Sequence, residues 1–310
     1  MKTFVSDALF NVGSLETSKL KEIFGFPPFS IFDTTSGDWI RRRNEWKKIG
    51  IKSELGRDDN LLRFSELVRL KRGGTSIFDP VLCELIYRWF TPQGNSKILD
   101  CFAGGSVRGI VASVLGKNYT GVDLRKEQID ANFFNFKEIK ENHKEIDFKD
   151  MNWICGDSQN IKDLAGDKKY DLIFSCPPYY DLEVYSEEKN DLSNLSNYDD
   201  FLRLYQKIII ESCSLLNDNR FACFVVGEIR DKKGAYRNFV GDTVRCFQNA
   251  GLHYYNEVIL VNTCGSLPIR IKSQFNSGRK IGKRHQNILI FYKGDMKKIK
   301  DIFGEVIIEN

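Results

Sequence analysis

The sequence predicts an α/β domain built on a doubly wound, mostly parallel sheet of seven strands. From residue 79 onward, short apolar runs alternate with amphipathic helical patterns, and this alternation places helices on both faces of a parallel sheet. The last two apolar runs have no helical pattern between them, so we expect an antiparallel hairpin around a long insert at 263–286. Residues 1–74 lack the alternation, so we expect a small helical or irregular extension there, beside a main domain at 75–310.

Each expected element has a local signal. Asp79 and Pro80 fit the N-cap and the first position of a helix at 79–90. Gly116 and Gly251 close the helices that precede them. Further helices are expected at 106–116, 125–144, 198–216 and 236–251. Strands are expected at 96–105, 119–124, 153–158, 170–178, 220–229, 253–262 and 287–294.

The composition argues against several classes of protein. With 42% hydrophobic residues, 28% charged residues and a net charge of +4, the chain has the balance of an ordinary globular protein, and a nucleic-acid partner is permitted. The eight cysteines include no CxxC pair and there are only three histidines, so we expect no metal site. The N-terminus lacks the apolar core of a signal peptide, and no apolar run is long enough to span a bilayer. We therefore expect a cytoplasmic protein without a membrane partner.

Glycines and acids follow successive strands at the place where a doubly wound sheet binds its ligands, beyond the carboxyl ends of the strands. Gly104 and Gly105 end the first central strand and allow a ligand to approach the backbone closely. Asp123 ends the next strand, where a carboxylate can accept from a ribose diol, and Asp157 ends the following one, where it can accept from an adenine amine. The pattern is not GxGxxG and no Walker lysine follows. A nucleoside without a phosphate chain, such as S-adenosylmethionine, fits better than a dinucleotide.

The strand at 170–178 ends in a proline-aromatic segment, Cys176-Pro177-Pro178-Tyr179-Tyr180. Two consecutive prolines remove two backbone donors and fix two φ angles, so a central strand cannot continue through them. The segment therefore forms a stiff shelf with aromatic rings beside it. Taken alone, it also fits a simple strand stop followed by packed tyrosines.

Several segments together resemble the motifs of amino-directed DNA methyltransferases, which modify N6 of adenine or N4 of cytosine. ILDCFAGGSVRG, YTGVDL, WICGDS and SCPPYY resemble motifs I, II, III and IV, and GGTSIFDPVLCELIYRWF just upstream resembles motif X. With FGFPPFSIFDT and GSLPIR, they are similar to phage-type and prophage-type enzymes over most of residues 24–295. The resemblance implies the class I fold of S-adenosylmethionine-dependent methyltransferases, S-adenosyl-L-methionine as cofactor and duplex DNA as partner.

The resemblance also implies which residues hold the cofactor. Asp100 and Gly104 would lie along its methionine part. Asp123 would hold the ribose and Asp157 the adenine, and the motif X-like stretch would close the pocket. The remaining expected cofactor contacts are Ser76 and Phe78 from that stretch and Phe102, Gly105, Leu124 and Ser158 from the strand ends.

By the same resemblance, the shelf would hold the target base. A base inside a duplex hides its exocyclic amine, so it must be flipped out at a cost of about a few kcal/mol, and stacking on an aromatic ring returns roughly 1–3 kcal/mol. We expect the ring of Tyr179 in this role and Tyr180 as second choice. Tyr185, in an acidic flap at 181–194, is a further candidate for stacking. The expected catalytic residues are Cys176, Pro177, Pro178 and Tyr179.

Cys176 departs from the family pattern, in which an Asp, Asn or Ser oxygen accepts from the target amine. A thiol is a weak acceptor and donor, and three alternatives follow. Cys176 replaces Ser while the main-chain carbonyl does most of the work, Ser175 shifts into its place, or the thiol attacks a pyrimidine C6 as in C5 methyltransferases. The last alternative needs a cation or a general acid to stabilise the thiolate. The choice between adenine and cytosine therefore stays open.

The insert at 263–286 is basic and contains no acid. A loop longer than about 15 residues inside a compact domain is commonly functional, and a basic one can follow phosphates. We expect it to bind DNA through Arg270, Lys272, Arg279, Lys280, Lys283 and Arg284. Two other functions also fit the sequence: an RNA methyltransferase on the same fold, and a methylase-like DNA-binding protein that has lost its activity through Cys176.

Overall fold

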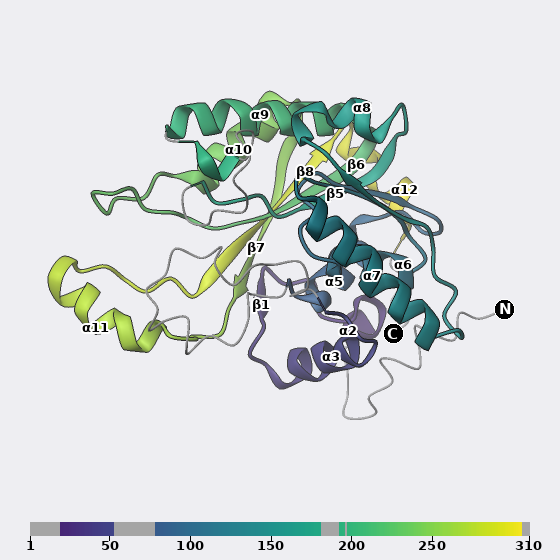
Figure 1. Ribbon diagram of the computed structural model, residues 1–310, viewed down its shortest axis with the longest axis horizontal. Helices are drawn as coiled ribbons and strands as arrows, with labels where there is room; N and C mark the ends of the chain where they lie inside the picture. Colours follow the sequence, from purple (N-terminus) through teal and green to yellow (C-terminus); the bar gives the residue numbers. More distant parts are fainter. Residues whose placement is uncertain (1–18, 53–77, 181–191, 196, 306–310) are drawn as a thin grey trace.

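The computed structural model describes residues 19–52, 78–180, 192–195 and 197–305. They form an eight-stranded sheet in the order β1-β7-β8-β6-β5-β2-β3-β4, with helices on both faces (Figure 1). The strands are β1 Ile31–Asp33, β2 Lys97–Asp100, β3 Asn118–Asp123, β4 Met151–Cys155, β5 Tyr170–Ser175, β6 Leu216–Val226, β7 His253–Val261 and β8 His285–Lys293.

The sheet is parallel except for one strand. β8 runs antiparallel to both of its neighbours, β6 and β7, and every other neighbouring pair is parallel. The mostly parallel sheet with an antiparallel hairpin at the end is confirmed, and it is the arrangement of class I S-adenosylmethionine-dependent methyltransferases. The carboxyl ends of β2, β3, β4, β5 and β6 consequently lie along one edge, where a parallel sheet binds its ligands.

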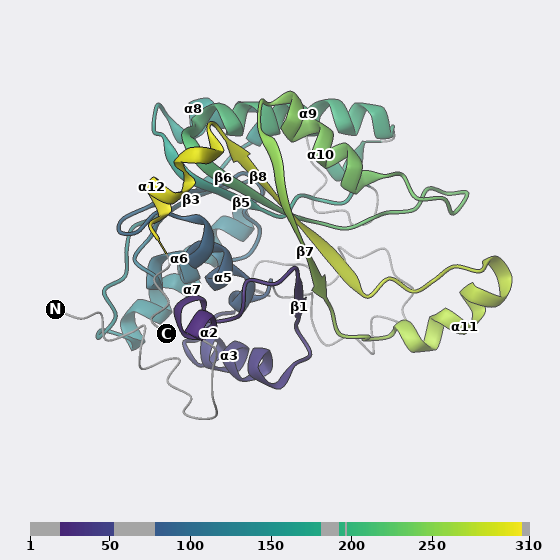
Figure 2. The same cartoon turned by 180° about the vertical axis from the view of Figure 1, so that it is seen from behind.

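Helices cover the two faces of the sheet in two groups. Alternate residues of β5 point to opposite faces: Leu172 and Phe174 belong to the core under α5 and α6, and Ile173 belongs to the core under α9 and α10. Figure 2 shows the same two layers from behind. The α-helices are α2 Lys19–Phe24, α3 Gly37–Lys48, α5 Pro80–Phe90, α6 Val107–Val114, α7 Lys126–Asn142, α8 Ile161–Ala165, α9 Tyr198–Leu215, α10 Phe239–Asn249, α11 Leu267–Gly278 and α12 Ile299–Phe303. Short 3-10 helices lie at Ser158–Asn160, Leu192–Asn194 and Met296–Lys298.

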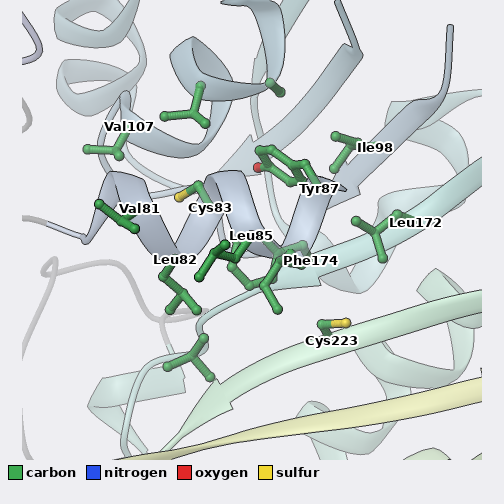
Figure 3. Close-up of a cluster of buried hydrophobic side chains, with 14 of the residues drawn as sticks. Val81, Leu82, Cys83, Leu85, Tyr87, Ile98, Val107, Leu172, Phe174 and Cys223 are labelled. Carbon is green, nitrogen blue, oxygen red and sulfur yellow. The ribbon is translucent and has the colours of Figure 1, made fainter. Parts of the chain in front are cut away.

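Helix α5 begins where the Asp-Pro pair predicts it. Asp79 accepts a hydrogen bond from the amide of Val81 at 2.9 Å, and Pro80 opens the first turn. The apolar face of the helix lies against the sheet, where Tyr87 packs edge-on against Phe174 (Figure 3). This packing fixes the helix directly behind the strand that leads into the proline-aromatic segment.

The structure corrects the expected strand count from seven to eight. The additional strand, β1, lies at the edge of the sheet and pairs in parallel with β7. It falls in the region that the sequence predicted to be helical or irregular. Trp39 and Trp46 of α3 are fully buried in the same core as α5. A three-residue strand is too short to show a measurable alternation, which is why no sequence signal marks it.

The insert between β7 and β8 is also more ordered than predicted. The expectation of a long loop was wrong, because residues Leu267–Gly278 form α11. Pro268 stands in the first turn and Arg279, with a φ of +51°, ends the helix in the left-handed region. None of the helix residues is buried, and the helix projects away from the sheet (Figure 1).

Candidate active site

The glycine turn after β2 is held by the acid that ends β3. Gly104 has a φ of +51°, a left-handed conformation that favours glycine. Its amide donates to Asp123 Oδ2 at 2.9 Å, and its carbonyl accepts from Asn132 of α7 at 2.8 Å. The turn is therefore fixed from both sides while its outer surface carries no side chain.

Asp123 retains capacity to bind a ligand. Its Oδ1 accepts from the amide of Arg125 at 2.9 Å, so each carboxylate oxygen has one backbone partner. An ionised carboxylate offers about four acceptor positions, so about two remain for another pair of donors. The side chain is only half-buried. Desolvation raises the pKa of Asp123 above its usual value, although the two amides oppose the shift.

The carboxylate of Asp100, by contrast, makes all of its hydrogen bonds inside the protein. It is completely buried. One oxygen accepts from Ser175 Oγ at 2.6 Å and from the amide of Phe102 at 3.2 Å, and the other accepts from Arg108 Nε at 2.5 Å and Tyr119 OH at 2.7 Å. Its acceptor positions are thus occupied, so it shapes the turn and does not present itself to a ligand.

Arg108 is a residue that the sequence interpretation missed. Its guanidinium pairs with Asp100 and donates to the carbonyls of Phe102 at 2.5 Å and Ala103 at 2.8 Å. It also lies 4.5 Å from the centroid of the Phe78 ring. The charge of Asp100 keeps the pKa of Arg108 above its usual value despite burial. An arginine one turn after a glycine-rich segment is the available signal, but it looks the same as an ordinary helix residue.

The other expected cofactor residues lie around the same turn. Asp157 accepts from the amide of Gln159 at 2.9 Å and caps the short helix that follows β4. Ser158 donates to the carbonyl of Cys101 at 2.6 Å, and the Leu124 carbonyl accepts from a thiol, Cys155 Sγ, at 3.6 Å. The ends of β2, β3 and β4 are therefore bonded to one another. Gly105 follows directly in the turn, and Ser76 lies outside the described residues.

The proline-aromatic segment is joined directly to the glycine turn. Ser175, the last residue of β5, donates to Asp100 and accepts from the amide of Phe102 at 3.0 Å. Cys176 is half-buried and Pro177 is buried, so the segment stays packed against the protein where it leaves the sheet. Pro178 is half-buried beside it.

Tyr179 lies between the ends of two strands. Its hydroxyl accepts from Gln286 Nε2 of β8 at 2.7 Å and donates to the carbonyl of Val225 of β6 at 3.4 Å. Its ring packs edge-on against Phe239 and is half-buried. The hydroxyl and the ring of Tyr179 are therefore both held in place by neighbouring residues, which suits a ring on which a flat ligand stacks.

Tyr180 is placed differently from the expectation that it could stack on the substrate. Its side chain is 3% exposed and packs against Tyr198 and Phe201, so it belongs to the core. Its φ of +49° turns the chain inward immediately after the shelf. Tyr185 lies outside the described residues.

The basic residues of the insert divide into two groups. Lys272 of α11 and Arg279, directly after the helix, are exposed, while Arg270 is half-buried. Lys280 and Lys283 are also half-buried, and desolvation lowers the pKa of Lys283. Arg284 is exposed and donates to the Asn262 carbonyl at 3.3 Å, which ties the two ends of the insert together. The structure thus places these side chains on a projecting element whose base is next to Tyr179.

Two negative findings apply to the part of the chain that the structure describes. Within it, no group of three or more His, Cys, Asp or Glu side chains could hold a metal ion. In the same ranges, no helix has the length and apolar character needed to cross a bilayer.

The chain has partial sequence and structural similarity to known proteins. No family model matches it. Over 99 residues it is 31% identical to ribosomal RNA small subunit methyltransferase D of Buchnera aphidicola, a match that covers 31% of this chain and 48% of that protein. The chain thus spans about half the length of this curated relative.

Solved structures with a similar fold at low identity include two from Thermus thermophilus. TrmN from Thermus thermophilus is 12% identical, with 70% of this chain and 49% of that chain covered and a TM-score of 0.44. A second Thermus thermophilus protein, described as a proposed DNA modification methylase, is 18% identical, with 45% and 51% covered and a TM-score of 0.34. At these values the likeness does not discriminate among substrates, so the choice of substrate depends on the site itself.

Proposed function

We propose that the chain is an S-adenosyl-L-methionine-dependent methyltransferase that transfers a methyl group to an exocyclic amine, N6 of adenine or N4 of cytosine, of a flipped-out base in DNA. The observation that carries the proposal is the Ser175 bridge between the glycine turn and the proline-aromatic segment. A donor bound at the turn and an acceptor bound on the shelf would lie at the ends of the neighbouring parallel strands β2 and β5.

The residues of the turn fit a nucleoside cofactor. Asp123 has acceptor positions left for a ribose diol, and the backbone at Gly104 is free of a side chain. Phe78 stands over the Arg108 guanidinium at the border of the turn. When bound, S-adenosyl-L-methionine supplies an electrophilic methyl group. The chain contributes the orientation of that group and the exclusion of water around it.

The shelf residues fit an exocyclic amine as acceptor. The ring of Tyr179 offers a stacking surface for a base, worth roughly 1–3 kcal/mol. Backbone carbonyls are strong hydrogen-bond acceptors, so a carbonyl of this segment would accept from the amine and leave its lone pair directed at the methyl group. Fixing both reactants in this way supplies most of the acceleration, and no covalent bond to the protein is required. Cys176 then acts as a substitute for the Ser of the resembled motif.

The experiment that tests this function is nucleoside mass spectrometry of DNA from cells expressing the protein, compared with a Cys176→Ser variant. N6-methyladenine or N4-methylcytosine in both samples is the expected result and identifies the target atom. A 5-methylpyrimidine that disappears in Cys176→Ser would overturn the proposal and make Cys176 a nucleophile.

A second candidate is methylation of RNA. The observation that favours it is the 31% identity over 99 residues to a ribosomal RNA methyltransferase. The same proline-aromatic shelf would hold an unpaired base of RNA without the cost of opening a duplex. Purified protein supplied with labelled methyl donor and either duplex DNA or total cellular RNA separates the two, because label in RNA alone would replace the DNA proposal.

A further inference from the structure

We infer that a second basic element, the hairpin at residues 230–236, forms with the insert a two-sided clamp for the phosphate backbone of duplex DNA. The inference rests on the proposed function, because that function places the substrate base at Tyr179. Arg230 and Tyr236 close the hairpin through an antiparallel bridge. The tip carries two adjacent lysines, Lys232 and Lys233, which are exposed.

The acidic side chains near these lysines accept hydrogen bonds from backbone amides of the hairpin and of the helix that follows it. Asp231 is the only acid in the sequence of the hairpin, and its Oδ1 accepts from the amide of Ala235 at 2.9 Å to shape the turn. Glu228, at the base, accepts from the amides of Phe239 and Val240 at 3.3 and 3.0 Å and so caps α10. The net charge at the tip is therefore positive and directed outward.

The hairpin also holds an exposed aromatic ring in a fixed position. The Arg230 guanidinium lies 4.0 Å from the centroid of the Tyr236 ring and donates to the Gly234 carbonyl at 2.7 Å. Tyr236 is nevertheless 48% exposed. A cation stacked on an exposed ring beside two exposed lysines is the composition of a surface that follows a polynucleotide backbone.

The two basic elements start next to each other, with Tyr179 between their bases. The hairpin leaves the sheet after Val226, and Val226 pairs with Asn287 at the start of β8, where the insert ends. The Tyr179 hydroxyl contacts both sides, Val225 on one and Gln286 on the other. Figures 1 and 2 show both elements extending beyond the same end of the sheet.

The hairpin and the insert also contact each other farther from the sheet. The Lys280 ammonium lies against Gly234, where an added Cβ would fall 2.8 Å from Nζ. The hairpin and the insert therefore present their charges as one connected surface around the shelf. Phosphates on the two sides of a flipped nucleotide would each meet one of them.

The test is the salt dependence of DNA binding by a Lys232→Ala/Lys233→Ala double variant. Binding of a labelled DNA duplex is followed by fluorescence anisotropy over a series of NaCl concentrations. Each lost phosphate contact lowers the slope of log K against log salt by about 0.9, so we expect the slope to fall by about two. We expect the affinity at low salt to fall by about an order of magnitude or more. The matched control is Lys297→Ala/Lys298→Ala, two exposed adjacent lysines beyond the opposite end of β8, which should leave the slope unchanged.

Each outcome decides the inference. S-adenosyl-L-methionine binding, measured by calorimetry, should be equal in the wild type and in both variants, which shows that the hairpin variant is folded. If the wild type binds duplex DNA with a steep salt slope and the hairpin variant has the same slope, the clamp is wrong while the proposed function stands. If the wild type shows salt-dependent binding of RNA but none of duplex DNA, both the clamp and the DNA proposal fall.

Discussion

The Ser175 hydroxyl donates a 2.6 Å hydrogen bond to the buried carboxylate of Asp100, and this bond joins the two halves of the candidate active site. Ser175 directly precedes the proline-aromatic segment, and Asp100 directly precedes the glycine turn. Because the hydroxyl also accepts from the amide of Phe102 at 3.0 Å, the two segments cannot move independently. Their relative position decides how far the methyl donor lies from the acceptor.

Removing this bridge should impair catalysis more than it impairs folding. In Ser175→Ala, the loss of a hydrogen bond to a charged group should lower the free energy of unfolding by about 1.5–3 kcal/mol. We expect kcat to fall by at least tenfold while the Kd for S-adenosyl-L-methionine changes less, because Asp123 is untouched. Ser113→Ala is the control, since Ser113 is equally buried and donates one bond to the Lys149 carbonyl far from the turn. Equal loss of kcat in both variants would show that Ser175 has only a structural role.

The ion pair between Asp100 and Arg108 should be a strong determinant of stability. Both side chains are buried, and removing one partner of a buried pair leaves an uncompensated charge at a cost of about 3–5 kcal/mol. We expect Arg108→Met to lose this amount in urea unfolding, and Asp100→Asn/Arg108→Met to recover part of it. Arg203→Met is the control, because the Arg203–Asp200 pair is exposed and should contribute little. A loss in Arg108→Met no larger than in the control would contradict the assignment.

The order of strands and helices could be predicted because each central element has its own signal. The helix at Pro80–Phe90 shows a cap, and β5 is an apolar run ended by prolines. β1 could not be predicted, since three residues gain their strand identity only by pairing with β7, more than 200 residues away in the chain. Helix α11 was missed for a different reason: it packs no residue into a core, so it lacks the apolar periodicity by which helices are found.

The site could be predicted in outline but not in its assignment of roles. The acids at strand ends were visible, and Asp123 has acceptor capacity for a ligand. In the sequence, Asp100 has the same kind of position at a strand end as Asp123. In the structure, however, its acceptor positions are occupied by donors from three other elements, Arg108, Tyr119 and Ser175. Which acid faces the ligand therefore depends on these tertiary contacts. The roles of Tyr179 and Tyr180 depend on tertiary contacts in the same way, because the two residues are adjacent in the chain but Tyr179 lies on the shelf and Tyr180 in the core.

Binding of S-adenosyl-L-methionine should weaken as the pH falls toward the raised pKa of Asp123. Burial raises the pKa of Asp123 above the value of about 3.9 for ordinary aspartate, so the carboxylate gains a proton as the pH falls toward that raised value. A protonated carboxyl has fewer acceptor positions for a ribose diol, so the Kd measured by calorimetry should rise in this window. Asp123→Asn is the control and should bind weakly at every pH without this step. A wild-type Kd that stays constant down to the ordinary aspartate pKa would remove Asp123 from the cofactor site.

The ring of Tyr179 should matter more than its hydroxyl. Tyr179→Ala removes a stacking surface worth roughly 1–3 kcal/mol, so kcat/KM for DNA should fall by about 5- to 150-fold. Tyr179→Phe keeps the ring and loses the hydroxyl's bonds to Gln286 and to the Val225 carbonyl. Gln286→Leu loses the 2.7 Å bond to the hydroxyl and the bond that Gln286 accepts from Asn262. We expect a smaller loss in each of these variants than in Tyr179→Ala. Tyr254→Ala is the control, since Tyr254 is a partly exposed tyrosine at the far end of the sheet. If Tyr179→Phe were as inactive as Tyr179→Ala, the hydroxyl rather than the ring would be the group that acts on the substrate, and the stacking role would be wrong.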